Sequence, residues 1–70
     1  MWAAIVLTLA LQESASALYT RGIELYNQGE IEAAVEALSK AAALAPNVPD
    51  YRFHLGLAYL KLGRARDRAL

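Results

Sequence analysis

Apolar residues recur at helical spacing over residues 18–28. Leu18, Gly22 and Leu25 fall on one stripe, because positions three and four apart share a face of a helix. Gly22 lowers helix stability relative to alanine, and close approach of a neighbouring helix is the usual compensation. Gly29 can take the left-handed conformation that ends many helices. The pattern predicts a helix over 18–28 that stops at Gly29 and packs closely at Gly22.

A second amphipathic helix is predicted over residues 30–45. Glu30, Glu32 and Glu36 lie toward the positive end of its dipole, and Lys40 follows Glu36 by one turn. These charges are expected on a solvated face, since a two-carboxylate catalytic site would need a cleft. The apolar face carries Ile31, Ala34, Val35, Leu38, Ala41 and Ala42.

A break separates this helix from a third one, predicted over residues 50–62. Pro46 disfavours continuation of the second helix, and Pro49 suits the first position of the third. Either Asn47 or Val48 then caps the third helix, and Asn47 has the better capping chemistry.

The third helix is apolar on two sides. The side predicted to face the second helix consists of Tyr51, Leu55, Ala58, Tyr59 and Leu62. The other apolar side carries Phe53, Leu57 and Leu60 and points elsewhere. Gly63 is predicted to end the helix, and the basic stretch 64–70 either frays or adds a last helical turn.

Residues 2–11 form an almost entirely apolar run, with Thr8 as its only polar member. As a helix the run would be about 15 Å long, which is too short to cross a membrane alone. Its length suits the apolar region of a secretory signal, and Ala-Ser-Ala at 15–17 supplies a cleavage pattern, although no Lys or Arg precedes the run. The alternative is one helix from about residue 2 to residue 27, buried in an assembly or in lipid, since no Pro or Gly interrupts residues 1–21.

Part of the pattern returns 34 residues later, with Gly22 recurring as Gly56 and Gly29 as Gly63. This period is the signature of tetratricopeptide (TPR) repeats, which are built from helix–turn–helix units, and the chain resembles that family over about residues 15–63. The family positions hold Leu18, Arg21, Gly22, Leu25, Ala34, Leu38, Ala41 and Pro46 in the first unit, and Arg52, Leu55, Gly56 and Tyr59 in the second. The resemblance implies an all-α fold with an antiparallel helix hairpin and a third helix, about one and a half units, preceded by an apolar helical extension.

Three arginines depart from the family pattern: Arg21, Arg52 and Arg68. Arg68 matters most, because the family places a small residue there, where two helices approach closely. Residues 64–70 are therefore not expected to pack as a regular second helix. The predicted organisation is an apolar segment over 1–17, a helical repeat over 18–63 and a basic stub over 64–70.

Composition narrows the classes of function. The chain has 70 residues, no Cys and a hydrophobic fraction of 57%, so a small core without disulfides or a thiolate zinc site is expected to need burial against other chains or lipid. Residues 1–50 carry two cations and six carboxylates, whereas residues 51–70 carry five cations and one carboxylate. Such asymmetry can steer partners, although the basic end is more typical of a solvated helix end than of a nucleic-acid surface.

No catalytic constellation is present in the sequence. His54 is the only His, and a lone His on a helix is typically a surface or partner-contacting residue. No phosphate-binding glycine loop or Ser/His/Asp set occurs. We expect a non-enzyme without cofactor or metal.

The resemblance implies a partner-binding surface on the first helix of each unit. By position that surface comprises Tyr19, Ile23, Tyr26, Asn27, Asp50, Phe53, Leu57, Leu60 and Lys61. It lacks the Lys/Arg/Asn set with which some relatives clamp a terminal carboxylate, and it is apolar and aromatic instead. An exposed apolar stripe of this size usually marks an interface, with Tyr19, Ile23, Tyr26, Phe53, Leu57 and Leu60 as its contacts. The ordinary alternative is that these residues form the core of a small domain.

Repeat units need neighbours, so the leading hypothesis is a non-catalytic module that self-associates into a homo-oligomer or a fibre of stacked subunits. The expected assembly residues are Trp2, Ile5, Val6, Leu9, Arg64, Arg66 and Arg68. A second hypothesis is an exported adaptor (periplasmic, cell-surface or extracellular) in which residues 18–70 bind a partner's peptide or helix after cleavage. A third is a membrane-associated accessory subunit that lies on the bilayer through residues 2–11, anchored by Trp2.

Overall fold

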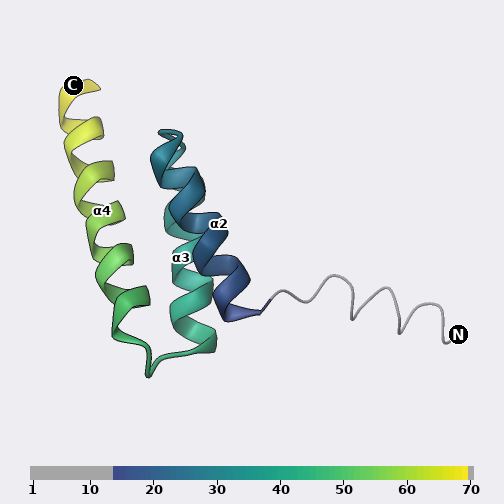
Figure 1. The fold of residues 1–70 in the computed structure, drawn as a ribbon. Coiled ribbons are helices and arrows are strands. Elements are labelled where there is room, and N and C mark those ends of the chain that lie inside the picture. Colours follow the sequence, from purple (N-terminus) through teal and green to yellow (C-terminus); the bar gives the residue numbers. More distant parts are fainter. Residues whose placement is uncertain (1–13, 70) are drawn as a thin grey trace, which may run out of the picture.

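Three α-helices make up the part of the chain that the computed structural model describes, residues 14–69 with side chains to residue 67. They are α2 (Ala15–Asn27), α3 (Ile31–Leu44) and α4 (Pro49–Ala69), and these residues contain no strand. In Figure 1, α2 and α3 form an antiparallel hairpin and α4 reverses direction again beside α3. The predicted all-α fold, a helix hairpin plus a third helix, is confirmed.

The central helix of the three is α3. It packs along both of its neighbours, whereas α2 and α4 meet at few places. The apolar extension predicted over residues 1–13, with Trp2, Ile5, Val6 and Leu9, lies outside the described residues.

The first helix begins at Ala15, one turn earlier than predicted. Ser14 precedes it with an extended backbone (φ −71°, ψ 159°), and its Oγ accepts a hydrogen bond of 3.1 Å from the backbone N–H of Ala17. An N-cap serine satisfies one of the N–H groups that a helix start leaves unpaired. The alternative of one continuous helix from residue 2 to residue 27 is therefore wrong, because Ser14 has an extended backbone and α2 begins only at Ala15.

Gly29 ends the hairpin's first helix, as predicted. It adopts a positive φ of 84°. Its own N–H donates to the carbonyl of Tyr26 at 3.1 Å, and the N–H of Glu30 donates to the carbonyl of Leu25 at 2.9 Å. This pair of bonds is the Schellman arrangement, which satisfies the last carbonyls of a helix and turns the chain sharply.

The core lies at the hairpin, where Gly22 meets Leu38. A Cβ placed on Gly22 would lie 2.6 Å from Leu38 Cγ and 2.7 Å from Leu38 Cδ2, so the side chain of Leu38 occupies the space that any larger residue would need. The predicted close approach at Gly22 is confirmed. The buried apolar residues are Leu18, Ile31, Ala34, Ala37, Leu38, Ala41 and Ala58.

The third helix is longer than predicted. It begins at Pro49, which takes the first helical position as expected, and Val48 occupies the preceding cap position. It continues through Gly63 to Ala69, so the prediction that Gly63 ends it was wrong, and the boundary drawn at residue 63 falls inside α4. Gly63 keeps a negative φ, and residues 64–67 after it are all exposed. Gly29, in contrast, is followed by Ile31, which is buried in the core.

The faces of α4 follow the predicted pattern with one exception. Ala58 is fully buried, whereas Phe53, Leu57 and Leu60 are 62%, 36% and 53% exposed, as expected for a side that points away from α3. Tyr59 was predicted to face α3 and is 54% exposed instead, so that prediction was wrong.

Candidate functional site

An open groove runs between the end of α2 and the second half of α4. It encloses about 380 Å³ and is lined by Tyr26, Leu57, Leu60, Lys61, Arg64 and Ala65. We call it the α2–α4 groove. It forms because α4 contacts α3 closely but α2 only sparsely. Apart from Tyr26 of α2, its lining side chains come from one side of α4, at helical spacing.

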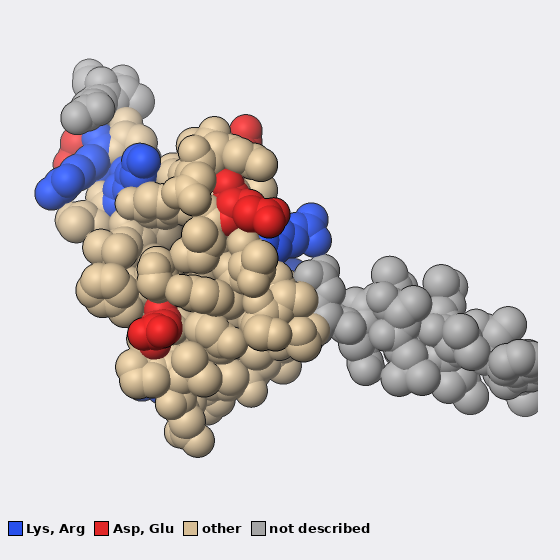
Figure 2. Space-filling model, viewed as in Figure 1, with Lys and Arg blue, Asp and Glu red and all other residues tan. Residues whose placement is uncertain are grey.

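Positive charge borders this apolar groove. Lys61 Nζ lies 4.7 Å from the centroid of the Tyr26 ring, within the range of a cation–π interaction. Arg64 follows on the same side of α4 and is exposed. Figure 2 shows Lys and Arg side chains gathered over the last turns of α4 at the upper left. The groove therefore combines an apolar surface with a cationic rim.

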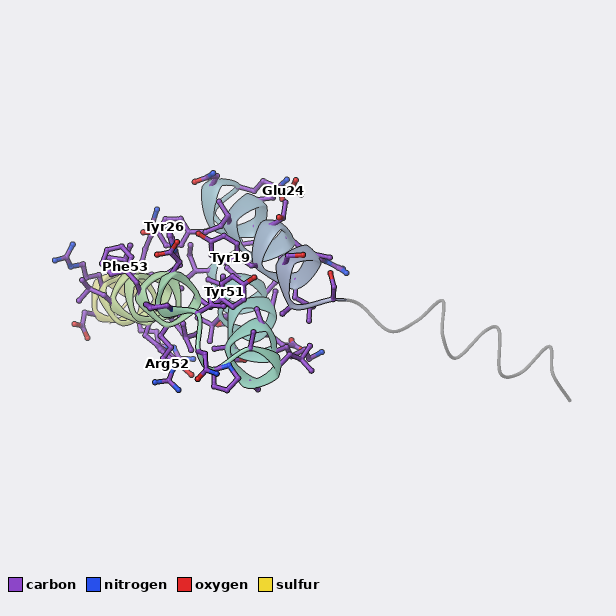
Figure 3. All side chains as sticks on the ribbon, turned by 60° about the horizontal axis from the view of Figure 1, so that its bottom comes forward. Tyr19, Glu24, Tyr26, Tyr51, Arg52 and Phe53 are labelled. Carbon is purple, nitrogen blue, oxygen red and sulfur yellow. The ribbon has the colours of Figure 1, made fainter. Side chains whose placement is uncertain are left out.

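An aromatic cluster holds α4 against α2 near the starts of these two helices. The rings of Tyr19 and Tyr51 lie 4.7 Å apart, and His54 meets Tyr19 edge-on at 5.2 Å. Figure 3 shows Tyr19 and Tyr51 side by side between the helices. His54 Nδ1 lies 3.0 Å from the Tyr19 hydroxyl and 2.9 Å from the Asp50 carbonyl oxygen, so it can accept from the hydroxyl or donate to the carbonyl.

Removal of the Tyr19 hydroxyl tests this cluster. Tyr19→Phe keeps the ring but loses the hydrogen bond to His54, so we expect the free energy of unfolding to fall by about 1 kcal/mol in a urea titration. The control is Tyr59→Phe, the same change on an exposed ring, for which we expect a change within about 0.5 kcal/mol. Equal effects of the two variants would show that the Tyr19–His54 bond does not stabilise the packing of α4.

The structure gathers only part of the predicted partner-binding set. Tyr26, Leu57 and Leu60 line the α2–α4 groove. Tyr19 and Ile23 are half-buried, and Tyr19 packs against Tyr51 and His54 of α4. Phe53 lies outside the groove, with its ring edge-on to His54 at 5.4 Å. Asn27 and Asp50 are exposed, and a role for any of these residues in partner binding stays a prediction.

Two groove residues lie beyond the predicted helix end. Arg64 was predicted only as an assembly residue, and no role was predicted for Ala65, because the helix was predicted to stop at Gly63. Both follow Leu60 and Lys61 at helical spacing, which would have placed them in the groove had the helix been continued. Of the other expected assembly arginines, Arg66 is exposed, and only the helical backbone of Arg68 is described.

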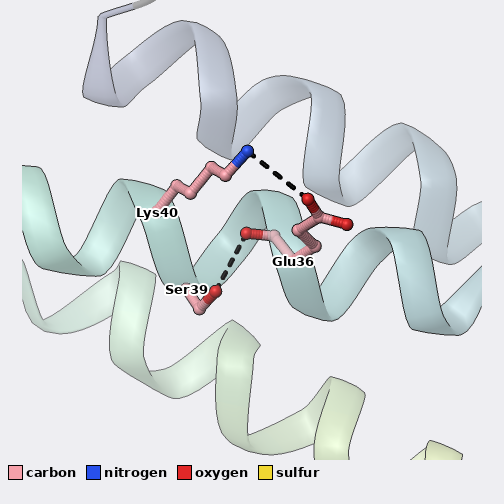
Figure 4. A network of polar contacts seen from close by, with 3 residues as sticks. All are labelled: Glu36, Ser39 and Lys40. Carbon is pink, nitrogen blue, oxygen red and sulfur yellow. Dashed lines mark hydrogen bonds and ion pairs between the residues drawn. The ribbon is translucent and has the colours of Figure 1, made fainter.

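A second, smaller depression lies on the other side of the hairpin. It encloses about 180 Å³ and is lined by Leu18, Arg21, Leu25, Ala33, Glu36, Ala37 and Lys40. In Figure 4, Lys40 Nζ lies 3.4 Å from Glu36 Oε1, and the hydroxyl of Ser39 donates to the Glu36 carbonyl at 2.9 Å. Both charged side chains are well exposed, so the ion pair stabilises the helix little. Glu30, Glu32 and Glu36 are all exposed, as predicted for a solvated acidic face.

No group of three metal-binding side chains occurs among residues 14–67. His54 is engaged by Tyr19 and by the Asp50 carbonyl rather than by a nucleophile.

Residues 22–63 match a family model described as TPR repeat. The matched stretch runs from the close contact at Gly22 to Gly63 in α4, and it covers more than half of the 70-residue chain. No curated protein and no solved structure matches the chain.

Proposed function

Because the chain belongs to the TPR repeat family, we propose that it is a non-catalytic interaction module that binds a protein segment in the α2–α4 groove. The observation that carries the proposal is the exposure of Leu57 and Leu60 beside the cations Lys61 and Arg64 in one open groove. Exposed apolar side chains that line a groove are typical of binding sites for helices and peptides.

The composition of the groove defines the chemistry of its partner. Burial of the exposed parts of Leu57 and Leu60 would contribute about 25 cal/mol for each Å² of apolar surface removed from water. The cations Lys61 and Arg64 favour carboxylates beside the partner's apolar residues, because complementary charge at the rim speeds association and excludes wrong partners. The fitting partner is an amphipathic helix or peptide with acidic flanks.

We propose further that a second copy of the chain supplies this acidic segment. The start of α3 carries the exposed carboxylates Glu30, Glu32 and Glu36, which are opposite in charge to the basic rim of the groove. If each groove takes the acidic face of the next copy, the contact is heterologous and continues into a ring or a fibre. Figure 1 places the start of α3 and the end of α4 at the same end of the molecule, so two copies can also pair reciprocally and close as a dimer.

Particle mass tests self-association. We expect light scattering of the full chain, without detergent, to give an oligomer in about 20 mM salt and a smaller species in about 500 mM salt, because salt screens contacts between exposed charges. Leu60→Glu places a carboxylate in the groove and is expected to give a monomer. The control is Leu44→Glu, the same change at a site 61% exposed on α3, which should leave the mass unchanged.

The outcomes distinguish self-association through the groove from binding of another protein and from assembly through the N-terminal run. A monomer at both salt concentrations would rule out self-association, and a titration with an acidic amphipathic peptide would then decide whether the groove binds another protein. An equal effect of Leu44→Glu and Leu60→Glu would show that the groove is not the contact surface. Loss of the oligomer in a chain that lacks residues 1–13, with the groove intact, would assign assembly to the apolar N-terminal run.

Export is also proposed, on the sequence pattern alone. No helix among the described residues has the length and apolar character needed to span a membrane. The small residues of the expected cleavage pattern, at 15–17, form the first turn of α2. N-terminal sequencing of the mature protein is expected to give Leu18. A need for detergent during extraction would favour the membrane-associated alternative.

A further inference from the structure

The peptide bond expected to be cut during export, between Ala17 and Leu18, lies inside the first turns of α2. Ala17 is exposed, but Leu18 directly after it is only 8% exposed and belongs to the core of the hairpin. A cut at this bond would separate the cap of the helix from a residue that packs in the core.

Hydrogen bonds to Ser14 hold the residues on both sides of this bond in place. The N–H of Ala17 donates to the Ser14 hydroxyl at 3.1 Å. The N–H of Leu18, which is the nitrogen of the bond itself, donates to the Ser14 carbonyl at 3.0 Å. One turn later, the Thr20 hydroxyl donates to the Ser16 carbonyl at 3.0 Å. Ser14 therefore engages both N–H groups next to the bond, one through its side chain and one through its carbonyl.

An endopeptidase needs a different conformation at this bond. It binds the residues around the cut as an extended strand and pairs with backbone groups that the helix uses internally. Leu18 would also have to leave the core to enter the enzyme. The first turn must therefore open before hydrolysis, and the rate of cutting follows the population of opened chains when opening and closing are fast.

We propose that folding of the hairpin closes this cleavage site and that the Ser14 cap keeps it closed. In the opened chain, water adds across the peptide bond and the C–N bond breaks. Ala17 is left with a carboxylate and Leu18 with an ammonium group.

The cut chain folds less well than the uncut one. It lacks the Ser14 cap, and the new ammonium group of Leu18 lies at the positive end of the α2 dipole. Cutting and folding therefore compete, and a chain that folds first keeps its apolar run at 2–11. That this competition takes place during export rests on the function proposed above, whereas protection of the bond by the fold does not.

Digestion of the full chain by elastase, a serine endopeptidase that cuts after small residues, tests the protection. Mass spectrometry follows the initial rate at which the fragment beginning at Leu18 appears. A peptide of residues 8–24 supplies the rate for the unprotected bond, because an isolated helix of this length is marginal in water. We expect the folded chain to release the fragment at least about tenfold more slowly than the peptide does.

Removal of the cap should open the site. Ser14→Ala is expected to speed the cut in the folded chain about fivefold, which corresponds to about 1 kcal/mol of capping, and to leave the rate in the peptide unchanged. Ser14→Asp keeps an acceptor at the cap and should preserve the slow rate. The matched control is Ser39→Ala, which removes a hydroxyl that donates to a carbonyl of α3 and should change the rate by less than about twofold.

The outcomes separate this proposal from export. Equal rates for the folded chain and the peptide would overturn it, as would a Ser14→Ala chain that is cut no faster than the unchanged chain. A mature protein that does not begin at Leu18, together with slow cutting of the purified chain, would refute export with cleavage at this bond while still supporting closure of the site by the fold.

Discussion

Leu38→Ala is expected to lower the free energy of unfolding by about 3–5 kcal/mol, the upper part of the range for buried leucines. Leu38 is the largest fully buried side chain of the described residues, and it fills the contact between α2 and α3. Truncation removes its apolar contacts and leaves a cavity that two rigid helices can close only partly. A domain of this size has a total stability of roughly 4–10 kcal/mol, at about 0.05–0.15 kcal/mol per residue, so the variant should be largely unfolded at 37 °C.

The measurement is a urea titration followed by far-UV circular dichroism. The matched control is Leu44→Ala, the same truncation near the end of α3 at a side chain that is 61% exposed, where a change within about 0.5 kcal/mol is expected. A loss below about 1 kcal/mol for Leu38→Ala would show that α2 and α3 do not pack through this side chain in solution.

The hairpin could be predicted from the sequence because its burial follows helical spacing. Of the six residues assigned to one face of α3, Ile31, Ala34, Leu38 and Ala41 are buried, whereas Val35 and Ala42 are half-buried. Ala37 was missed, and it is 7% exposed. It lies three residues after Ala34 and four before Ala41, so the same helical spacing places it beside the buried face.

The groove was predictable only in part, because the two glycines that follow predicted helices behave differently. Gly29 turns the chain, and Ile31 then packs into the core. Gly63 stays helical, and Ala65, which stands where Ile31 follows Gly29, is small and exposed rather than packed into the core. The helix therefore extends far enough to bring Arg64 and Ala65 into the groove. The position of Gly63 in the sequence alone did not predict this extension.

The contact between Tyr19 and His54 depends on tertiary geometry. The two residues are 35 positions apart, and their helices are joined only through α3. Sequence spacing places each on its own helix, but the angle at which α4 crosses the hairpin decides whether they meet. This angle follows from the packing of whole side chains and has no local sequence signal.

Alanine at Gly22 and alanine at Gly56 are expected to change stability in opposite directions. A methyl group on Gly22 would lie 2.6 Å from Cγ of the fully buried Leu38, whereas a methyl group on Gly56 meets nothing within 4 Å. Overpacking costs about 1–3 kcal/mol, which outweighs the roughly 0.5–1 kcal/mol that alanine gains over glycine in a helix. We therefore expect Gly22→Ala to lower the free energy of unfolding by about 1–2 kcal/mol and Gly56→Ala to raise it by about 0.5–1 kcal/mol.

A double-mutant cycle isolates the cause of the Gly22 effect. If the methyl group collides with Leu38, Leu38→Ala relieves the collision, and alanine at position 22 then fills part of the cavity. The double variant Gly22→Ala with Leu38→Ala should therefore be more stable than the sum of the single losses predicts, by about 1–3 kcal/mol of coupling, the range found for residues in direct contact. Gly56→Ala combined with Leu38→Ala should show no coupling beyond about 0.5 kcal/mol, because the two residues share no contact. Strictly additive losses at Gly22 and Leu38 would mean that the two helices lie further apart in solution than the structure places them.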